Sequence, residues 1–327
     1  MPNIAINGFG RIGRVMFRVG FGKLNIVAIN TPRDAKTIAN LLKYDTVYGK
    51  FPGRISYTKN YLVVNGKKVR LFSEKDPLKI PWKELKVDVV AECTGKFTKK
   101  EDAMKHIKAG AKKVLLSAPS KDAEITVVMG VNHDKLKPKH KIVSNASCTT
   151  NCFAIIAKVL NDAFKIKNGY MVTVHSYTST QRIVDGSHKD LRRARAAAQN
   201  IVPTTSGAAL ATEKVLPSLK GKVHASAVRV PVIDGSLCNF VCTVSKKASK
   251  EKVNQTFYNA AKRLKKFLEY SKDEIVSSDI IGNNKSAVFD SLLTEVSGNM
   301  VKVVAWYDNE MGYASRMVDV AKLMLKK

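Results

Sequence analysis

Short apolar runs alternate with helical stretches through the first half of the chain. The runs are rich in β-branched residues and lie at residues 4–7, 25–29, 87–91, 113–116, 125–128 and 141–143. Runs of this length and composition are typical of strands that are buried on both faces of a sheet. Apolar residues recur with the period of a helix over residues 11–20, 35–44 and 101–109. Because strands alternate with helices, we expect an α/β fold with a doubly wound parallel sheet.

The pattern changes after position 148. A helical stretch at residues 151–162 leads to longer strands at residues 170–175, 222–229, 237–244 and 300–306, which long loops connect. This arrangement predicts a second, α+β layer with a mixed or antiparallel sheet. The last segment, residues 313–327, has apolar residues at helical spacing and predicts an amphipathic terminal helix. We expect that helix to return and pack on the first domain.

Length and composition agree with two packed domains. The chain has 327 residues, of which 45% are hydrophobic, and this argues against wholesale disorder. No apolar run approaches the roughly 18 residues that a membrane-spanning helix needs. The chain opens on a predicted strand and lacks the features of a secretory signal, so we expect a cytoplasmic protein.

The five cysteines are an odd number, and none lies in a CxxC pair. In a chain of this size without an export signal, this pattern argues against a disulfide framework. We therefore expect at least one cysteine to be present for its chemistry.

The net charge is +29, from 56 lysine and arginine residues against 27 acidic ones. Such a surface attracts nucleic acid or anionic membranes, or steers anionic substrates. The basic residues nevertheless form short, dispersed clusters, as at residues 246–247, 262–266 and 326–327, and no nucleic-acid-binding module is recognisable. We therefore favour a solvated surface without a membrane partner, and nucleic-acid or polyanion binding stays open as an alternative.

A glycine-rich turn follows the first predicted strand. Gly8, Gly10 and Gly13 have GxGxxG spacing, and the first predicted helix begins inside the motif. The glycines allow a tight turn, close approach of the backbone to a pyrophosphate, and close packing of helix on sheet. The N-terminus of the helix presents N–H groups and a positive dipole to the phosphates. The motif therefore predicts a dinucleotide site.

The end of the second predicted strand is where such a unit reads the ribose. An NAD-binding unit commonly places Asp or Glu there to bind the 2′-hydroxyl. Here the strand is followed by Thr31-Pro32-Arg33, so the expected acid is missing. A carboxylate would repel a 2′-phosphate, whereas threonine and arginine can accept one. Asp34 is an alternative acid, and a purely solvent-facing Arg33 is the competing interpretation.

One cysteine stands where a predicted strand turns into a helix. This residue, Cys148, gains thiolate character from the helix dipole and the N–H groups of the first turn. Cys152 lies one turn later and is expected to point inward. A small buried hydrophobe is the usual interpretation of a cysteine, and it suits Cys93, Cys238 and Cys242 better than Cys148, whose neighbours are polar.

His175 is the best candidate for a base. It ends the apolar run from residue 170, and strand ends are where an α/β architecture exposes functional groups. Four other histidines lie in lysine-rich contexts that indicate exposure, and a fifth falls in a predicted strand as a core candidate. They are His106, His133, His140 and His188, and then His224. A zinc site from Cys148, Cys152 and His175 is a weaker rival to a thiol–imidazole pair, because the CxxxC spacing lacks a second pair.

Together these residues resemble the phosphorylating glyceraldehyde-3-phosphate dehydrogenase family, from Ile6 to the C-terminus. The most specific block is Ala-Ser-Cys-Thr-Thr-Asn-Cys at residues 146–152. Further matching blocks lie at residues 7–14, 41–45, 188–195, 203–209, 229–231 and 306–310. So many colinear blocks leave little room for coincidence.

The resemblance implies a homotetramer of two-domain subunits. Residues 1–148, completed by a C-terminal helix at 312–327, would form a Rossmann-like dinucleotide-binding domain, and residues 149–311 the catalytic domain. Cys148 would attack the aldehyde of D-glyceraldehyde 3-phosphate. His175 would raise the thiolate population, take up the hydroxyl proton and stabilise the oxyanion together with the N–H of Cys148. Hydride would pass to the nicotinamide, and inorganic phosphate would cleave the thioester to 1,3-bisphosphoglycerate in a reversible reaction.

The resemblance also implies roles for further residues, with no metal among them. Thr178 and Arg229 would hold the substrate phosphate, and Asn309 would orient the nicotinamide amide, with Tyr313 nearby. The site for the attacking phosphate would be lined by Ser147, Thr149, Ser206 and Gly207. The other cofactor contacts would be Gly8, Gly10, Arg11, Ile12, Gly13, Thr94, Gly95 and Ser117.

Two departures from the family pattern fall in the catalytic domain. Ser206 replaces a usual threonine and keeps the side-chain hydroxyl group. Met311 replaces a usual tryptophan, and its consequence is left open. We expect Ser206 to change the chemistry little.

A third departure concerns the cofactor. NAD-specific members generally carry Asp at the position of Thr31 and a Leu-Pro pair where this chain has Gly186-Ser187, as the NADP-using photosynthetic members do. In the family tetramer that loop reaches a neighbouring subunit's cofactor, so Ser187 would bind a 2′-phosphate in trans. The nearby cations Arg33 and Lys75 also favour NADP. We expect NADP to be accepted and preferred, with NAD still used.

Two rivals remain. A dehydrogenase of another phosphorylated aldehyde, such as erythrose 4-phosphate, would share the chemistry of Cys148 and His175. A polyanion-binding or adhesion protein that retains the fold is suggested by the net charge of +29. The complete catalytic set favours an enzyme, with polyanion binding secondary to it.

Overall fold

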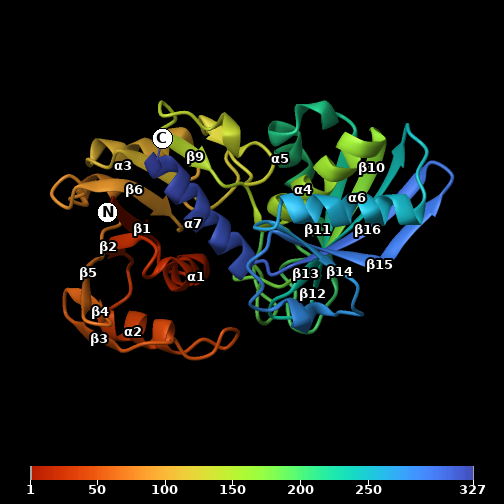
Figure 1. Cartoon of the computed structure of the whole chain (residues 1–327). Coiled ribbons are helices and arrows are strands. Elements are labelled where there is room, and N and C mark those ends of the chain that lie inside the picture. The colour runs from red at the N-terminus through yellow and green to blue at the C-terminus, as the bar shows by residue number, and fades with distance from the viewer. Residues whose placement is uncertain (1, 327) are drawn as a thin grey trace. The chain divides into compact units, whose positions relative to one another are not determined.

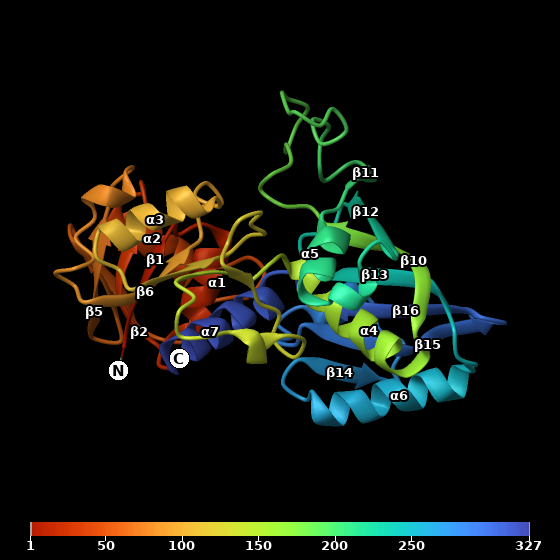
Figure 2. The ribbon, with the colours of Figure 1, turned by 90° about the horizontal axis from the view of Figure 1, so that it is seen from above.

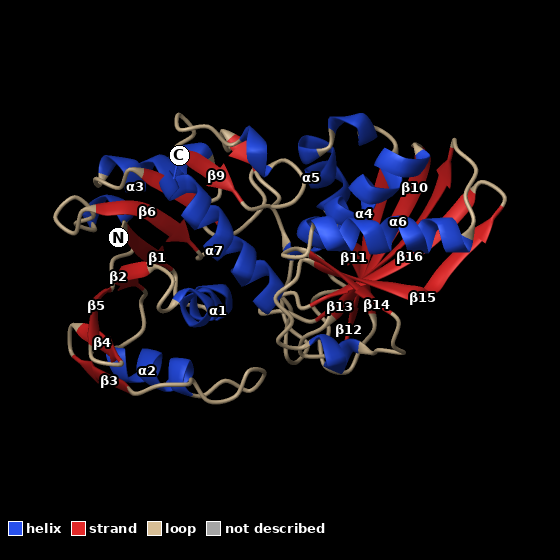
Figure 3. Cartoon of the chain, viewed as in Figure 1, coloured by secondary structure: helices blue, strands red, loops and turns tan. Residues whose placement is uncertain are grey.

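The computed structural model describes residues 2–326 and divides the chain into two compact units. The first unit runs to Ser147 and takes up the chain again from Ala314, and the second is Cys148–Tyr313. Each unit has its own sheet, with helices packed against it (Figure 3). Within residues 2–326, no helix is both long enough and apolar enough to span a membrane.

The first unit is built on a nine-stranded sheet in the order β3-β4-β5-β2-β1-β6-β7-β9-β8. Its strands are β1 (Asn3–Asn7), β2 (Asn25–Asn30), β3 (Ile55–Thr58), β4 (Tyr61–Val64), β5 (Lys67–Phe72), β6 (Val87–Glu92), β7 (Lys113–Leu116), β8 (Ile125–Thr126) and β9 (Ile142–Ser144). From β5 to β8 all neighbours are parallel, whereas β3, β4 and β5 pair antiparallel. The predicted α/β class and parallel sheet are confirmed, and an antiparallel extension that the sequence analysis missed is added at one edge.

Helices cover both faces of this sheet. The chain leaves β1 through α1 (Arg11–Gly20) toward β2, and leaves β6 through α3 (Lys100–Lys108) toward β7 on the opposite side. Right-handed crossovers in opposite directions place these two helices on opposite faces. The strands between them are therefore buried on both sides, which explains why β1 is apolar at consecutive positions.

Two further helices complete the first unit (Figure 1). The helix α2 (Ala35–Lys43) begins at Asp34, whose carboxylate accepts the N–H of Thr37 at 2.9 Å. The terminal helix α7 (Met311–Lys326) belongs to this unit from Ala314 onward. Lys113 of β7 donates to the carbonyl oxygen of Met324 in its last turn at 2.8 Å.

The second unit contains a seven-stranded mixed sheet in the order β11-β12-β10-β13-β16-β15-β14. Its strands are β10 (Ile166–Ser176), β11 (Val202–Thr205), β12 (Val223–Val230), β13 (Ser236–Val244), β14 (Leu268–Ser271), β15 (Ala287–Ser297) and β16 (Met300–Tyr307). The helices α4 (Cys148–Phe164), α5 (Ala208–Val215) and α6 (Lys250–Arg263) pack on one face. The long segment between β10 and β11 has no helix or strand and projects from this unit (green in Figure 2).

Two histidines lie where the sequence analysis did not expect them. His106 is fully buried, with 0% exposure, because it lies on the inner side of α3 while neighbouring lysines stay in contact with solvent. His224 is exposed rather than a core residue, because it lies on the solvent side of β12. Lysine content around a histidine therefore did not predict which side of the helix that histidine occupies.

The core of the second unit makes a testable prediction. The rings of Phe257 on α6 and Phe289 on β15 stack at 3.8 Å between centroids with an angle of 4° between planes, and both are fully buried. Replacing Phe257 with Ala should lower the free energy of unfolding by about 3–5 kcal/mol. The matched control is Tyr258→Ala on the same helix, whose exposed ring has an edge contact with Tyr270 and whose loss should cost less, about 0.5–1.5 kcal/mol. Chemical denaturation of both variants measures the difference, and equal losses would contradict this packing.

Candidate active site

Cys148 follows a strained turn. It is the first residue of α4, and the turn that joins this helix to β9 contains Ala146 with φ of 55°. This left-handed conformation is unfavourable for a residue with a Cβ atom. The N–H of Ala146 donates to Oγ of Ser144 at 3.1 Å, which helps to hold the turn. The turn allows the helix to start directly after the strand, so the thiol stands at the helix N-terminus.

The two predicted catalytic side chains lie together. Sγ of Cys148 is 3.4 Å from Nε2 of His175, which is buried near the end of β10. This distance is within reach of a hydrogen bond to sulfur, so a proton can pass directly between the two groups. Within residues 2–326, no group of three His, Cys, Asp or Glu side chains is arranged to hold a metal ion.

Burial opposes separate ionisation of either group. It raises the pKa of Cys148 to about 11, although the charge of Arg229 and the backbone N–H of Thr149 act in the opposite direction. Burial also lowers the pKa of His175 to about 3, and Arg229 lowers it further. For a thiol that ionises alone, burial therefore acts against the thiolate character that the helix N-terminus favours. Transfer of the proton from Sγ to Nε2 instead creates opposite charges that attract each other, so the two groups ionise as a pair.

Arg229 contacts the far side of the imidazole ring. β12 pairs in parallel with β10, which sets Arg229 opposite His175. Nη1 of Arg229 lies 2.8 Å from Nδ1 of His175 and donates to the carbonyl oxygen of Ser176 at 2.9 Å. That carbonyl oxygen is itself 2.7 Å from Nδ1. Nδ1 can therefore donate to Ser176, which leaves Nε2 as a base, or accept from Arg229, which leaves Nε2–H as a donor to sulfur.

Beneath the nucleophile lies a directional chain of hydroxyl groups. Oγ1 of Thr149 is 2.9 Å from the phenol oxygen of Tyr307, which is 2.8 Å from Oγ1 of Thr173. Thr173 donates to the carbonyl oxygen of Leu237 at 3.0 Å, so Tyr307 donates to Thr173 and Thr149 donates to Tyr307. The hydroxyl proton of Thr149 therefore points inward and is not available to the attacking phosphate, contrary to the role expected for this side chain. Tyr307 had no role assigned from the sequence, in which it is a phenol at the end of the largely apolar strand β16.

Asn309 has a fixed side-chain orientation. Its Oδ1 accepts from the hydroxyls of Ser176 at 2.9 Å and Ser236 at 2.7 Å. The hydroxyl oxygen of Ser236 in turn accepts the backbone N–H of Ser176 at 3.1 Å, so its proton is directed at Asn309. Nδ2 of Asn309 is thereby turned the other way and can donate to an amide carbonyl. Tyr313 is buried in the first turn of α7.

The predicted phosphate-binding residues lie at element ends of the second unit or directly before it. Oγ of Ser206 accepts the N–H of Ala208 at 3.3 Å, and Gly207 is the exposed N-cap of α5. Oγ1 of Thr178 is 2.8 Å from that of Thr180 in the segment after β10. Ser147 is half-buried directly before Cys148.

In the first unit, the glycine turn forms a cradle that side chains would fill. Gly8 has φ of 92°, and a Cβ atom there would lie 2.7 Å from the N of Thr94. A Cβ atom at Gly13 would lie 2.2 Å from the carbonyl oxygen of Gly8, whereas one at Gly10 would meet nothing within 4 Å. The turn is therefore closed on the protein side and open where a pyrophosphate would approach, which fits a dinucleotide.

The other predicted cofactor residues of this unit follow the carboxyl ends of parallel strands. Thr94 and Gly95 come after β6, and Ser117 comes directly after β7. This edge of a parallel sheet is where α/β proteins bind ligands. Ile12 is half-buried in the first turn of α1. The side chain of Arg11 is turned elsewhere, because its guanidinium pairs with Asp45 and stacks over a tyrosine ring.

The acid that follows β2 in the chain, Asp34, is engaged in a helix cap. The N–H of Thr31 donates to the carbonyl oxygen of Phe72 at 2.9 Å, which joins the ends of β2 and β5. Both carboxylate oxygens of Asp34 are used by Thr37, and these hydrogen bonds lower the pKa of Asp34. Arg33 and Lys75, which follow the two strands, are exposed.

Ser187 lies in the long segment of the second unit. Its carbonyl oxygen accepts from Nε and Nη2 of Arg182 at 2.8 and 2.6 Å. Ser187 and Arg182 line a surface hollow together with His188 and Lys189. A hydroxyl group among basic side chains is suited to an anionic ligand.

Comparison with known proteins agrees over both units. The family described as glyceraldehyde 3-phosphate dehydrogenase, NAD binding domain, matches residues 2–100, and its C-terminal domain matches residues 147–309. Glyceraldehyde-3-phosphate dehydrogenase 2 of Streptomyces avermitilis is 54% identical over 323 residues, which cover 97% of this chain and 96% of the relative. Glyceraldehyde-3-phosphate dehydrogenase 1 of Bacillus cereus is 52% identical over 332 residues, covering 100% and 99%. The enzyme of Thermotoga maritima is 52% identical over 332 residues, covering 100% of both.

The contact between sulfur and imidazole predicts a coupled ionisation. If His175 takes the thiol proton, His175→Asn should slow alkylation of Cys148 by iodoacetamide at about pH 7 by at least about tenfold. The two proteins should converge as the pH rises to about 11, where the thiol loses its proton without help. Cys148→Ser identifies the labelled thiol. Equal rates at neutral pH would show that Nε2 does not act as the base.

Proposed function

The chain belongs to the glyceraldehyde-3-phosphate dehydrogenase family, and from this premise we propose that it oxidises D-glyceraldehyde 3-phosphate reversibly to 1,3-bisphosphoglycerate. The chain is an oxidoreductase with a nicotinamide cofactor, which follows from its NAD-binding domain and its relatives. The observation that carries the proposal is the 3.4 Å contact between Sγ of Cys148 and Nε2 of His175 at a helix N-terminus.

The first step uses the neutral pair. Sγ attacks the aldehyde carbon while its proton passes to Nε2. No isolated thiolate or imidazolium therefore has to form in the site. The oxyanion that forms is stabilised by Nε2–H of His175 and by the backbone N–H of Cys148. It then takes the proton from Nε2 to become the hemithioacetal hydroxyl, which leaves His175 neutral again. Nδ1 keeps a hydrogen-bond partner in either protonation state, because Ser176 offers a carbonyl and Arg229 a donor.

The oxidation and phosphorolysis follow at the same sulfur. When bound, the nicotinamide supplies a hydride acceptor, and Asn309 would orient its carboxamide. His175 takes the proton of the hemithioacetal hydroxyl as the thioester forms. An oxygen of inorganic phosphate then attacks the thioester carbonyl, and the C–S bond breaks to return Cys148. Arg229 and Thr178 would hold the substrate phosphate, and Ser147, Ser206 and Gly207 the attacking phosphate.

We further propose that NADP is preferred and NAD is also used. Three features support this preference. Thr31 replaces the usual acid, Asp34 is used as a helix cap, and Arg33 and Lys75 follow adjacent strand ends as exposed cations. Ser187, in its basic hollow, would add a contact in trans within a homotetramer, which we propose as the working form in the cytoplasm.

Steady-state kinetics with glyceraldehyde 3-phosphate, phosphate and either dinucleotide test the proposal. We expect a higher kcat/KM with NADP than with NAD, and a lower kcat/KM when erythrose 4-phosphate replaces the substrate. A preference for NAD would overturn the cofactor proposal and leave the dehydrogenase proposal standing. Absence of activity with both dinucleotides in reduced protein would overturn the enzyme proposal.

A carboxylate at position 31 should reverse the cofactor preference. Thr31→Asp places a negative charge beside the 2′-phosphate, and the ratio of kcat/KM for NADP to that for NAD should fall about tenfold or more. Thr58→Asp is the control, because it adds the same charge at an exposed position on the outermost strand β3. If the two substitutions change the ratio equally, Thr31 is not beside the 2′-phosphate.

A further inference from the structure

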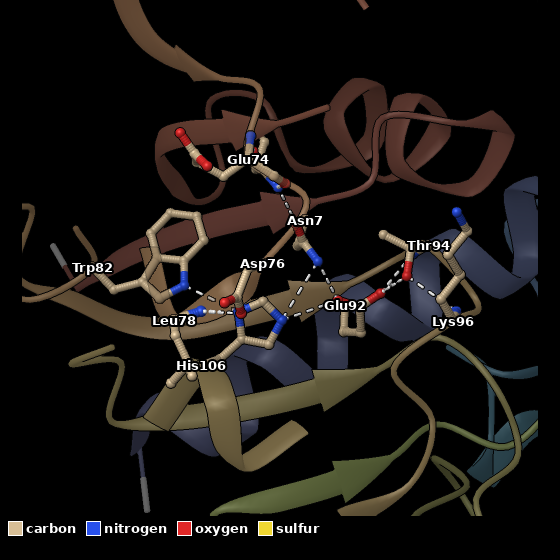
Figure 4. Close-up of polar contacts among 10 residues, drawn as sticks. Asn7, Glu74, Asp76, Leu78, Trp82, Glu92, Thr94, Lys96 and His106 are labelled. Carbon is tan, nitrogen blue, oxygen red and sulfur yellow. Dashed lines mark hydrogen bonds and ion pairs between the residues drawn. The ribbon is translucent and has the colours of Figure 1, made fainter. Parts of the chain in front are cut away.

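A buried chain of polar side chains lies beneath the glycine turn of the first unit (Figure 4). It runs from Asn30 through Asn7, Glu92 and His106 to Trp82, and all five side chains are buried. Asn30, Asn7 and Glu92 end the adjacent strands β2, β1 and β6 and lie opposite one another in register. The chemistry proposed above makes no use of Glu92 or His106, so their burial needs another explanation.

One end of the chain fixes the protonation of His106. The indole N–H of Trp82 can only donate, and it lies 3.0 Å from Nδ1 of His106. Nδ1 must therefore accept, which places the ring proton on Nε2. Nε2 is 3.1 Å from Oε2 of Glu92, so the ring donates to the carboxylate.

The other end fixes the orientation of two amides. The backbone N–H of Glu74 donates to Oδ1 of Asn30 at 2.8 Å, and Nδ2 of Asn30 donates to the carbonyl oxygen of Glu74 at 2.9 Å. Nδ2 also donates to Oδ1 of Asn7 at 2.6 Å. Asn7 must therefore turn its Nδ2 toward Oε2 of Glu92, to which it donates.

The second oxygen of Glu92 also meets only donors. Oε1 accepts the backbone N–H of Thr94 at 2.7 Å and the hydroxyl of the same residue. That hydroxyl oxygen accepts the N–H of Lys96 at 3.1 Å, so its proton is directed at Glu92. Every neighbour of the carboxyl group is thus a donor whose direction is set elsewhere. A carboxylate satisfies them all, whereas a glutamine would place its NH₂ group against a donor in either orientation.

The carboxylate connects the two backbone segments of the cofactor cradle. Asn7 directly precedes Gly8, and the N of Thr94 is the atom that a Cβ at Gly8 would meet at 2.7 Å. The N–H of Cys93 donates to the carbonyl oxygen of Asn7 at 2.7 Å. Glu92 therefore links the residue that precedes Gly8 to the loop after β6, where the backbone of Gly8 passes close to Thr94.

We propose that Glu92 is a positioning residue for the dinucleotide, acting through its hydrogen bonds to Asn7 and Thr94. This inference rests on the proposed function for the identity of the ligand. Its role is to preorganise the turn before the pyrophosphate arrives, so the ligand does not have to order that backbone itself. Cys148 and His175 belong to the second unit.

The sharpest test compares two carboxylates on one strand. Asp88 also lies on β6 and also bridges to β1, since Oδ2 accepts the backbone N–H of Asn3 at 2.7 Å, but at the end remote from the glycine turn. Glu92→Gln should raise the Kd for NADP, measured by calorimetry on the full chain, about tenfold or more. Asp88→Asn should change it by less than about twofold. At saturating NADP, kcat should stay within about twofold of the parent for both variants.

Hydrogen exchange of the unliganded protein gives a readout that does not depend on the cofactor. Glu92→Gln should speed exchange of the peptide that contains residues 93–97, because the N–H of Thr94 loses its acceptor or gains a repelling neighbour. Asp88→Asn should leave that peptide unchanged. Unchanged exchange in Glu92→Gln, or a Kd for NADP no higher than that of Asp88→Asn, would overturn the proposal.

Two other results would be interpreted as follows. If the parent chain binds neither NADP nor NAD, the proposed function is wrong, and the exchange comparison alone decides whether Glu92 holds the turn. If Glu92→Gln does not fold, Trp82→Phe replaces it, because loss of the indole N–H releases the proton position of His106 while an aromatic ring stays in the core. That variant should raise the Kd for NADP about threefold with kcat unchanged, and an unchanged Kd would overturn the proposal.

Discussion

The chemistry of this chain depends on a sulfur and an imidazole that lie close enough to exchange a proton directly. Burial raises the pKa of Cys148 to about 11 and lowers that of His175 to about 3, so either charge alone is unfavourable. A direct proton transfer over 3.4 Å avoids both penalties at once, because each new charge is formed beside its opposite. This requirement explains why the surrounding structure fixes the positions of the sulfur and the imidazole ring. The left-handed turn at Ala146 places the sulfur, and the pairing of β10 with β12 places Arg229 against the ring.

The cost of burying unpaired polar groups also determines how the polar side chains away from the nucleophile are arranged. A buried donor or acceptor without a partner destabilises the fold, so buried polar side chains form hydrogen-bonded sets. In both units these sets have a direction, because one end meets a group that can only donate or only accept. The carbonyl of Leu237 orders Thr173, Tyr307 and Thr149, and the indole of Trp82 orders His106 and Glu92. Each ordered set ends beside a backbone segment that a ligand would approach.

Local sequence patterns predicted the parts of the site that depend on local geometry. The glycine spacing, the position of Cys148 at the start of a helix and that of His175 at the end of a strand could all be read from neighbouring residues. The fold class followed from the alternation of elements, but the hairpins of β3, β4 and β5 were missed. β3 and β5 mix polar with apolar residues, and the apolar strand β4 is only four residues long. Tertiary contacts decided the rest. His106 is buried because of Trp82 and Glu92, which lie 24 and 14 residues away along the chain.

The shift in the thiol pKa shows most clearly why local reasoning has a limit. The helix N-terminus is visible in the sequence, and its effect on a cysteine has a known sign. Burial has the opposite sign and depends on how many atoms surround the sulfur, which only the packed structure specifies. The net charge of +29, in contrast, follows from composition alone and needs no structure to be known. It favours every anionic ligand without selecting one. Selection between such ligands must therefore come from fixed short-range contacts, and the proposed role of Glu92 is of this kind, since a buried negative group would hold the glycine turn in place in a chain rich in cations.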